Sequence, residues 1–424
     1  MLSEKFIVVF VFLAVLGLTI FFDSRKTKIV WAAVAILFLT GCLTVRDAFY
    51  SVDWNVLLLY LGMLVTGETL IYSKMPDYIA THLASKTKTV GMAMLVICVF
   101  AGVLSMFIMN IAVVLLLAPV ALLIAKKVEV SPVPLFIGIA LMANLEGAST
   151  LIGDPPSMLL GSFEGYTFND FIFFGGKPSM FFAVQAAALA AIPLLYLYFR
   201  RYDHKMPEIK PEGFVSIIPT VFVVLMIGSL AASSSFSWGV PYPEGLICLF
   251  FGALNLIWYL HHRRGNNVRE FVHSMDWHTA VFLVGIFMLI GCLSSSGIVE
   301  DAARHIVKSS GNSPLRAYVI INVVSLAVSA FVLNIPYLAV MTPVAEMIAW
   351  QVNVNPHALF FGLLLSGSVG GNITPFGASA NVVALGTLKE HGYDSKSIDF
   401  IKIGLPFALV STLVGSTIIW LLFS

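Results

Sequence analysis

The chain has 424 residues, of which 59% are hydrophobic and only 11% charged, and its mean hydropathy is +0.93. Soluble domains carry about 25% charged residues, so this composition excludes a soluble globular protein. The formal net charge of +1 says nothing about partners, and we expect no nucleic-acid partner. The four cysteines are far apart and form no metal or redox spacing, and no group of residues is typical of an active site. We therefore expect neither an enzyme nor a bound cofactor or metal.

Apolar segments follow one another along the whole chain. A helix needs about 20 apolar residues to cross about 30 Å of hydrocarbon. Only a helix or a closed barrel satisfies its backbone in lipid, and no barrel-like alternation occurs here. The sequence therefore predicts an all-α polytopic membrane protein. The apolar segments are 5–22, 28–45, 54–72, 90–125, 133–162, 180–199, 214–231, 243–261, 276–297, 316–350, 357–386 and 402–423.

Four of these segments are long and interrupted. Segments 90–125 and 316–350 are too long for one crossing, and each is interrupted at its middle, by SMFIMNIA and SAFVLNIP. We predict that both are re-entrant hairpins. Segments 133–162 and 357–386 are interrupted by LIGDPPS and TPFGASAN. Glycine and proline at these points favour helices that unwind inside the membrane.

The two halves of the chain match without gaps through both hairpins and both interrupted helices. An ungapped match past Asn, Pro and Gly is not expected by chance, so we predict two repeats, 1–205 and 206–424. Each would contain five transmembrane helices and one hairpin. The matching pairs, all 224 residues apart, are Ser105/Ser329, Phe107/Phe331, Asn110/Asn334, Pro119/Pro343, Gly147/Gly371, Thr150/Thr374 and Gly153/Gly377.

The distribution of Lys and Arg predicts the topology. With ten crossings and two hairpins, 18 of the 24 Lys and Arg residues fall on one side and 6 on the other. The positive-inside rule then places both termini outside a cytoplasmic (inner) membrane that the chain spans many times. Five crossings separate each helix from its repeat mate. Because five is odd, the repeats are inverted.

Inverted repeats with broken helices place the substrate near the membrane midplane. We expect Asn110 and Asn334 to be the principal ligands, because each lies at a hairpin turn and an amide both donates and accepts hydrogen bonds. The alternative is that they cap the hairpin helices, and the two roles can coexist. The other expected substrate-binding residues are Ser105, Ser329, Thr150, Gly153, Thr374, Gly377, Ser379 and Asn381.

Two acids at membrane depth are candidates for proton coupling. An ionisable group inside a membrane is costly and usually functional. Asp154 lies in the GDPP turn, where it could instead satisfy the N-terminal amides of the next half-helix. Glu146 has no acidic counterpart, since Gly370 occupies the matching position. Glu68 is a weaker candidate because nothing in the sequence fixes its depth.

The hairpin tips SMFIMNIAVVLLLAPV and SAFVLNIPYLAVMTPV resemble the ion transporter superfamily. This group includes arsenite permeases, NhaD-type sodium/proton antiporters and divalent-anion/sodium symporters. The loops NLEGASTLIGDPPSMLLG and GGNITPFGASANVVALG are most similar to the arsenite-permease and NhaD branch. The resemblance covers nearly the whole chain. It implies a scaffold domain that forms a homodimer and a transport domain that moves as an elevator.

The hairpin tips also depart from this superfamily. Its divalent-anion symporters carry Ser-Asn-Thr at both tips, where this chain has Met109-Asn110-Ile111 and Leu333-Asn334-Ile335. Many NhaD-like members have Asp directly before the Asn. Sodium prefers several oxygen ligands, and each change replaces a candidate oxygen with an apolar group. The tips therefore argue against sodium coupling.

An apolar pocket with paired amides and no cation suits a small neutral solute with several hydroxyls. At neutral pH arsenite and antimonite are mostly such species, As(OH)3 and Sb(OH)3. The sequence therefore favours proton-coupled efflux of arsenite or antimonite. Two other kinds of transport stay open, a sodium/proton antiporter of the NhaD type and a carboxylate or oxyanion transporter. A channel or a non-transporting membrane scaffold is the alternative from another class.

Overall fold

The computed structural model describes residues 2–22, 25–211, 213–235, 241–262, 268–295 and 297–424. Arg263 and Arg264, counted on the predicted cytoplasmic side, lie outside these ranges. The helices of the first half are α1 (Leu2–Phe21), α2 (Lys26–Leu39), α3 (Val45–Ser51), α4 (Trp54–Ser73), α5 (Met75–Ser85), α6 (Val90–Ser105), α7 (Asn110–Val128), α8 (Val133–Gly147), α9 (Pro155–Glu164) and α10 (Met180–Phe199).

The second half is also helical. Its elements are α11 (Ile218–Ser233), α12 (Pro243–His262), α13 (Val268–Ser274), α14 (Trp277–Ser295), α15 (Ile298–Ser310), α16 (Pro314–Ser329), α17 (Asn334–Val352), α18 (Pro356–Gly370), η3 (Gly371–Ile373), α19 (Ser379–Glu390) and α20 (Ser397–Phe423). The first half also contains a 3-10 turn, η2 (Asn169–Phe171), and two paired two-residue strands, β1 (Phe173–Phe174) and β2 (Lys177–Pro178).

Each interrupted segment forms two helices separated by a few residues. Segment 90–125 covers α6 and most of α7, which pack against each other, and segment 316–350 covers most of α16 and of α17, which do the same. Segment 133–162 unwinds after α8 and resumes as α9, and segment 357–386 unwinds between α18 and α19. In all four, the helix after the break begins at a polar or proline residue.

Hydropathy did not predict the short helices α3, α5, α13 and α15. Helix α15 is amphipathic and carries Glu300, Asp301, Arg304 and Lys308, so it does not appear as an apolar run. Lys5 of α1 pairs with Asp301 at 2.5 Å and anchors this helix. Within the described residues, five helices are long and apolar enough to cross a membrane, namely α4, α7, α10, α12 and α20. The number of ten crossings stays a prediction.

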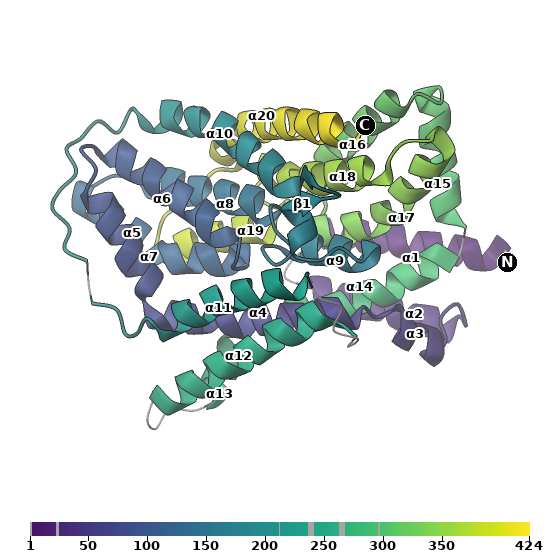
Figure 1. Cartoon of the computed structure of the whole chain (residues 1–424), viewed down its shortest axis with the longest axis horizontal. Helices are drawn as coiled ribbons and strands as arrows, with labels where there is room; N and C mark the ends of the chain where they lie inside the picture. The colour runs from purple at the N-terminus through teal and green to yellow at the C-terminus, as the bar shows by residue number, and fades with distance from the viewer. Residues whose placement is uncertain (1, 23–24, 212, 236–240, 263–267, 296) are drawn as a thin grey trace.

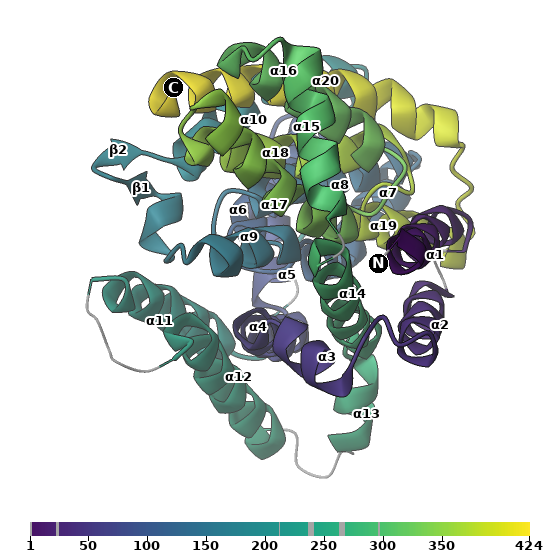
Figure 2. The ribbon, with the colours of Figure 1, turned by 90° about the vertical axis from the view of Figure 1, so that its right-hand side faces the viewer.

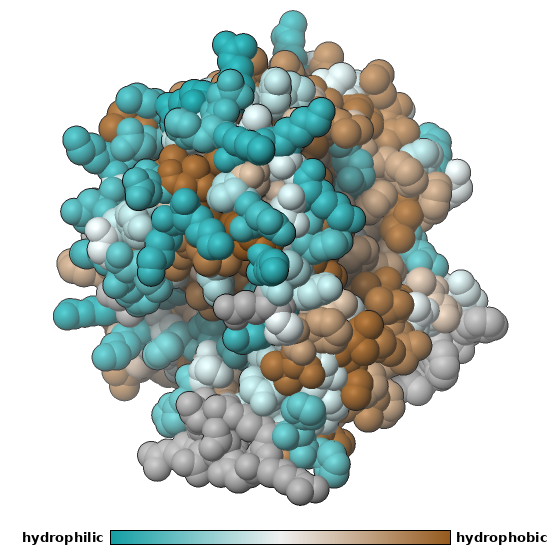
Figure 3. Space-filling view, turned by 90° about the vertical axis from the view of Figure 1, so that its left-hand side faces the viewer, coloured by the Kyte–Doolittle hydropathy of each residue, from teal (hydrophilic) through white to brown (hydrophobic). Residues whose placement is uncertain are grey.

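Most long helices run along the longest axis of the molecule; the N-terminus lies at its right-hand end, and the C-terminus lies in the same half (Figure 1). Viewed from that end, α4, α11 and α12 lie beside one another and below the group that contains α8, α16, α18 and α20 (Figure 2). The opposite end, where α13 and the connection from α10 to α11 lie, is rich in hydrophilic side chains (Figure 3).

Helices α4 and α12 cross at glycine. A Cβ added at Gly62 would lie 2.3 Å from the carbonyl carbon and oxygen of Cys248, and one added at Gly252 would lie 2.9 Å from the Gly62 oxygen. Without a hydrophobic driving force between helices in lipid, such backbone contact is the usual basis of helix association. This crossing joins α11 and α12 to the helix that supplies one wall of the site described below.

We predict that Gly62→Ala separates α4 from α12 and lowers the thermal stability of the purified protein, by about 1–3 kcal/mol, the usual cost of overpacking. Gly228→Ala in α11 is the matched control, because within the described residues no atom beyond its own stretch of helix lies within 4 Å of the position of an added Cβ. Melting temperatures in detergent measure the difference. Equal temperatures for the two variants would contradict the packing described here.

Candidate substrate site

The breaks in the four interrupted segments meet at one small cavity. Helices α7 and α17 begin at its lining residues Asn110 and Asn334, α9 begins at Pro155 directly after Asp154, and α19 begins at Ser379. A helix N-terminus carries partial positive charge and unpaired N–H groups. The cavity is therefore surrounded by four helix ends of the same sign. It is lined by Tyr60, Met109, Asn110, Ile111, Asp154, Pro155, Thr279, Asn334, Ile335 and Ser379.

Asp154 is the acid in this cavity. Its side chain is only 3% exposed, and its Oδ2 accepts a hydrogen bond of 3.5 Å from the Nδ2 of Asn334. Asn110 is its other amide neighbour. Although Asp154 occupies the N-cap position of α9, its side chain makes no capping hydrogen bond. The carboxyl therefore faces the hairpin tips rather than its own helix.

Asn110 and Asn334 have the same local geometry. Each Oδ1 accepts the N–H of the next residue, from Ile111 at 2.9 Å and from Ile335 at 3.0 Å. The amide nitrogens donate elsewhere, Asn334 to Asp154 and Asn110 to the Oδ1 of Asn144 at 2.9 Å. Thus the amide oxygen of each side chain accepts a backbone N–H at the start of its own helix, and the amide nitrogen donates a hydrogen bond to a different element.

A chain of buried amides connects the two halves of the protein. The Nδ2 of Asn144 in α8 donates to the Oδ1 of Asn372 at 2.8 Å and to the Oδ1 of Asn381 at 2.9 Å. Asn381 in turn donates to the carbonyls of Gly371 and Thr374. A fully bonded polar network in a low-dielectric interior favours a single arrangement. The network therefore fixes the first hairpin against the unwound loop of the second half.

Of the five predicted hydroxyl ligands, Ser379 lines the cavity, whereas the other four bond to backbone carbonyls and do not line it. In each half, one hydroxyl of the hairpin and one of the loop join these two elements. The donor and the acceptor of each bond in the first half are 224 residue numbers before those of the matching bond in the second half. The bonds run from Ser105 to Ala143, Thr150 to Met106, Ser329 to Gly367 and Thr374 to Ala330.

Gly153 and Gly377 allow each loop to touch its hairpin. A Cβ at Gly153 would lie 2.6 Å from the Ser105 carbonyl oxygen and 2.5 Å from that of Gly147. At Gly377 the corresponding contact to the Ser329 oxygen would be 2.8 Å. Any side chain at either position would push the loop away. These two glycines shape the site without facing the cavity.

Glu146 lies away from the cavity. Its Oε2 accepts a hydrogen bond of 2.6 Å from Gln185 of α10, and its Cγ would lie 2.9 Å from a Cβ added at Gly102 of α6. The structure thus brings Asp154, but not Glu146, to the hairpin tips. Glu68 accepts a hydrogen bond of 3.2 Å from Ser274 of α13 and is also absent from the lining.

Sequence reasoning missed two polar residues of the cavity, Tyr60 of α4 and Thr279 of α14. Thr279 is held by the Oδ2 of Asp276 at 2.6 Å, and the Tyr60 hydroxyl donates to the Asp276 carbonyl at 3.4 Å. The available signal was the Asp-Trp pair that precedes both helices, at residues 53–54 and 276–277. It marks α4 and α14 as equivalent helices, and the second turn of α4 and the first turn of α14 supply this wall.

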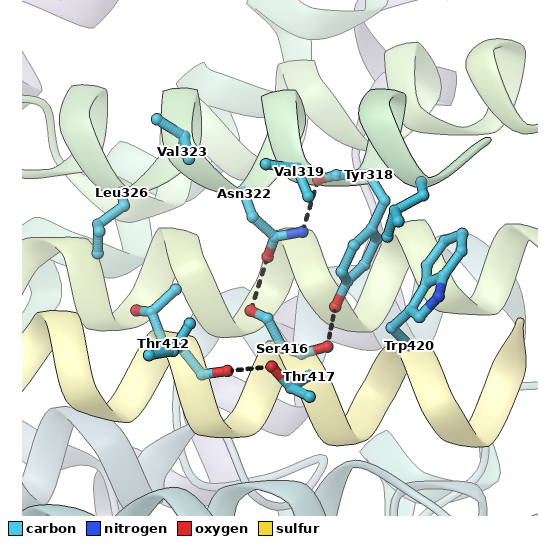
Figure 4. Close-up of a pocket in the computed structure, with 11 residues that line it drawn as sticks. Tyr318, Val319, Asn322, Val323, Leu326, Thr412, Ser416, Thr417 and Trp420 are labelled. Carbon is cyan, nitrogen blue, oxygen red and sulfur yellow. Dashed lines mark hydrogen bonds between the residues drawn. The ribbon is translucent and has the colours of Figure 1, made fainter. Parts of the chain in front are cut away.

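The cavity has a volume of about 20 Å³, which is room for roughly one water molecule. Admission of a substrate therefore requires the hairpin tips to separate. A larger hollow of about 260 Å³ lies between α16 and α20 (Figure 4). Its polar groups bond to each other, Tyr318 to the Ser416 carbonyl at 2.7 Å and the Ser416 hydroxyl to Asn322 at 2.9 Å. They join these two helices and leave the hollow largely apolar.

Comparison with known proteins places this arrangement among transporters. A family model described as CitMHS, citrate transporter, matches residues 18–304 and 267–424. An uncharacterized transporter of Mycobacterium tuberculosis is 28% identical over 406 residues, which cover 93% of this chain and 94% of that protein.

Two solved structures share the fold. The YdaH transporter of Alcanivorax borkumensis, whose topology is described as unusual, superposes with a TM-score of 0.59 at 14% identity, over 99% of this chain and 98% of that one. MtrF of Neisseria gonorrhoeae, described as illuminating a class of antimetabolite efflux pumps, gives a TM-score of 0.58 at 15% identity, over 92% and 84%. At these identities the likeness concerns the fold alone.

We predict that Asn144→Ala lowers the thermal stability of the protein by about 1–3 kcal/mol, because three amides lose a buried partner. Asn255→Ala is the matched control. Asn255 is equally buried, but its amide donates only within its own helix, to the Phe251 carbonyl. Melting temperatures of the two purified variants decide the matter. If Asn255→Ala lowers the melting temperature as much as Asn144→Ala does, the amide network makes no special contribution to stability.

Proposed function

Because this chain belongs to the citrate transporter family, and is thus a secondary transporter, we propose that it carries a small carboxylate together with a proton. The cavity between the hairpin tips is its binding site in this proposal. The description of the family supports a carboxylate as the substrate. The sequence alone favoured arsenite or antimonite, which becomes the second candidate.

One observation supports an anion most directly, the meeting of the N-termini of α7, α9, α17 and α19 at one cavity. Helix N-termini bind carboxylate and phosphate oxygens through their free N–H groups and their partial positive charge. No Lys or Arg lines this cavity in the described part of the chain. The four helix ends would therefore supply the positive potential, and the amide nitrogens of Asn110 and Asn334 would add donors.

Asp154 would couple this anion to a proton. Two unit negative charges about 4 Å apart repel by about 4 kcal/mol at an effective dielectric constant of about 20. An ionised Asp154 would therefore exclude a carboxylate from the cavity, whereas the protonated acid would accept it. Binding of each would favour binding of the other. Such mutual preference predicts that proton and carboxylate move in the same direction.

The second candidate is efflux of arsenite or antimonite coupled to protons. The apolar side chains of Met109, Ile111 and Ile335 in the lining favour it, because a neutral trihydroxy solute needs hydrogen bonds but no counter-charge. A sodium/proton antiporter has less support, since Met109 and Leu333 offer no oxygen to a sodium ion. Flux of radiolabelled citrate and of arsenite into the same proteoliposomes separates the candidates.

We extend the proposal to the architecture. The hydroxyl bonds that recur at an offset of 224 residues support two inverted repeats, 1–205 and 206–424. The separate position of α4, α11 and α12 in Figure 2 supports a scaffold beside a moving transport domain, as in an elevator. In this proposal the scaffold forms a homodimer in the cytoplasmic membrane, with both termini outside.

We predict that Asn110→Ala and Asn334→Ala each reduce transport about tenfold while the protein still folds. Loss of one hydrogen bond to a carboxylate forfeits about 1.5–3 kcal/mol, which corresponds to a reduction of about tenfold or more. Uptake of radiolabelled citrate into proteoliposomes at equal protein content measures this, with Asn255→Ala as the control. Wild-type uptake in both tip variants would limit Asn110 and Asn334 to a capping role.

We predict that Asp154→Asn uncouples transport. The amide keeps the size of the side chain and its contact with Asn334, but it can neither ionise nor carry a proton. The variant should exchange citrate across the membrane without accumulating it in response to a pH gradient. Glu146→Gln, away from the cavity, should still accumulate it. If Asp154→Asn accumulates citrate as the wild type does, or if Glu146→Gln alone fails, the coupling acid is wrongly assigned.

A further inference from the structure

A charged pocket of about 270 Å³ lies far from the transport cavity. It is formed by the residues just before and at the start of α8, by the C-terminal end of α10 and by the N-terminal end of α20. It therefore joins elements from both halves of the chain. The residues that carry its chemistry are Ser131, Tyr198, Arg201, Asp394, Asp399 and Lys402. The connection that follows α10 begins at the hydrophilic end of the molecule (Figures 1 and 3).

The guanidinium of Arg201 is held in place by two tyrosines. Its central carbon lies 4.0 Å from the centroid of the Tyr198 ring and 5.1 Å from that of the Tyr202 ring. Its Nη2 donates to the Tyr202 hydroxyl at 3.3 Å. Arginine has five N–H donors in a planar fork that matches phosphate or carboxylate oxygens. Contact with the two aromatic rings restricts the orientation of this fork.

Charges of both signs line the pocket without neutralising each other. Arg201 and Lys402 are the cations, and Asp394 and Asp399 are the anions. Within the part of the chain that the structure describes, no ion pair of 4.0 Å or less joins any of these four residues. The pocket thus offers two cations to an anionic group and two carboxylates to an ammonium group. A zwitterionic ligand matches both kinds of group.

An apolar stripe leads away from this pocket along α20. Ile398, Leu405, Leu409 and Leu413 are spaced by three, four or seven residues and lie on the same face as Lys402. Their side chains are 51%, 38%, 49% and 70% exposed. A stripe of this kind on a membrane-spanning helix contacts hydrocarbon chains. The charged pocket and the stripe together match an amphiphile with a zwitterionic head.

We propose that this pocket binds the headgroup of a phospholipid that carries both a phosphate and a primary ammonium group, as in phosphatidylethanolamine. The phosphate lies against Arg201 and Lys402, the ammonium against Asp394 and Asp399, and an acyl chain follows α20. A lipid bound in this way joins α8 and α10 to α20. It stabilises the contact between the two halves on this side of the protein.

The test is native mass spectrometry of the full chain in detergent with added phosphatidylethanolamine or phosphatidylglycerol of identical acyl chains. Phosphatidylethanolamine should bind more tightly. Arg201→Ala should weaken its binding about tenfold, as expected for the loss of one hydrogen bond to a charged group. Arg200→Ala, the neighbouring exposed arginine outside the pocket, should change it less than about twofold. Asp399→Asn should remove the preference for phosphatidylethanolamine over phosphatidylglycerol.

Three results would overturn the proposal. The first is equal retention of phosphatidylethanolamine by Arg201→Ala and Arg200→Ala. The second is equal binding of the two phospholipids by the wild type. The third is that free phosphoethanolamine displaces the lipid at equal concentration, which would make the pocket a site for a soluble zwitterion. If Arg201→Ala does not fold, Lys402→Gln with Lys396→Gln as its control gives the same comparison.

Discussion

A helix that is interrupted inside a membrane exposes backbone N–H and C=O groups, and lipid cannot satisfy them. The rest of this structure depends on that constraint. Each interrupted segment directs the new helix end toward the other three rather than toward the hydrocarbon. The carbonyls left at the breaks accept hydrogen bonds from Ser105, Thr150, Ser329 and Thr374. At the new helix starts the N–H groups of Ile111 and Ile335 bond to the side chains of Asn110 and Asn334, and the four N-termini together give the cavity a positive potential.

The single carboxyl at this site gains its role from the same geometry. Asp154 is buried among four helix N-termini. A second anion in the cavity would repel its ionised form and so favour its protonation. The amides of Asn110 and Asn334 contact Asp154 from the two hairpins. A change in the charge of Asp154 therefore alters its interaction with both hairpin tips. In this account, protonation and closure of the hairpins are linked through these two contacts.

The sequence predicted the interrupted segments because breaks depend on Gly, Pro and Asn, which are visible without a structure. It could not separate Asp154 from Glu146. Both acids lie in one loop region, and which of them faces the cavity depends on the path of the chain after Gly147, where Gly153 allows contact with the first hairpin. Tyr60 and Thr279 were missed because they belong to helices that are far from the hairpins in sequence. The favoured substrate also changed, because the sequence left a carboxylate or oxyanion open as an alternative and the match to the citrate transporter family now favours a carboxylate.

The linkage between anion and proton can be measured directly by calorimetric titration of the detergent-solubilised protein with citrate in buffers of different ionisation enthalpy. The slope of the observed enthalpy against the buffer enthalpy gives the number of protons bound with each citrate. The account predicts that the wild type takes up about one more proton per citrate than Asp154→Asn does. Equal proton uptake by the two proteins would show that Asp154 does not sense the bound anion.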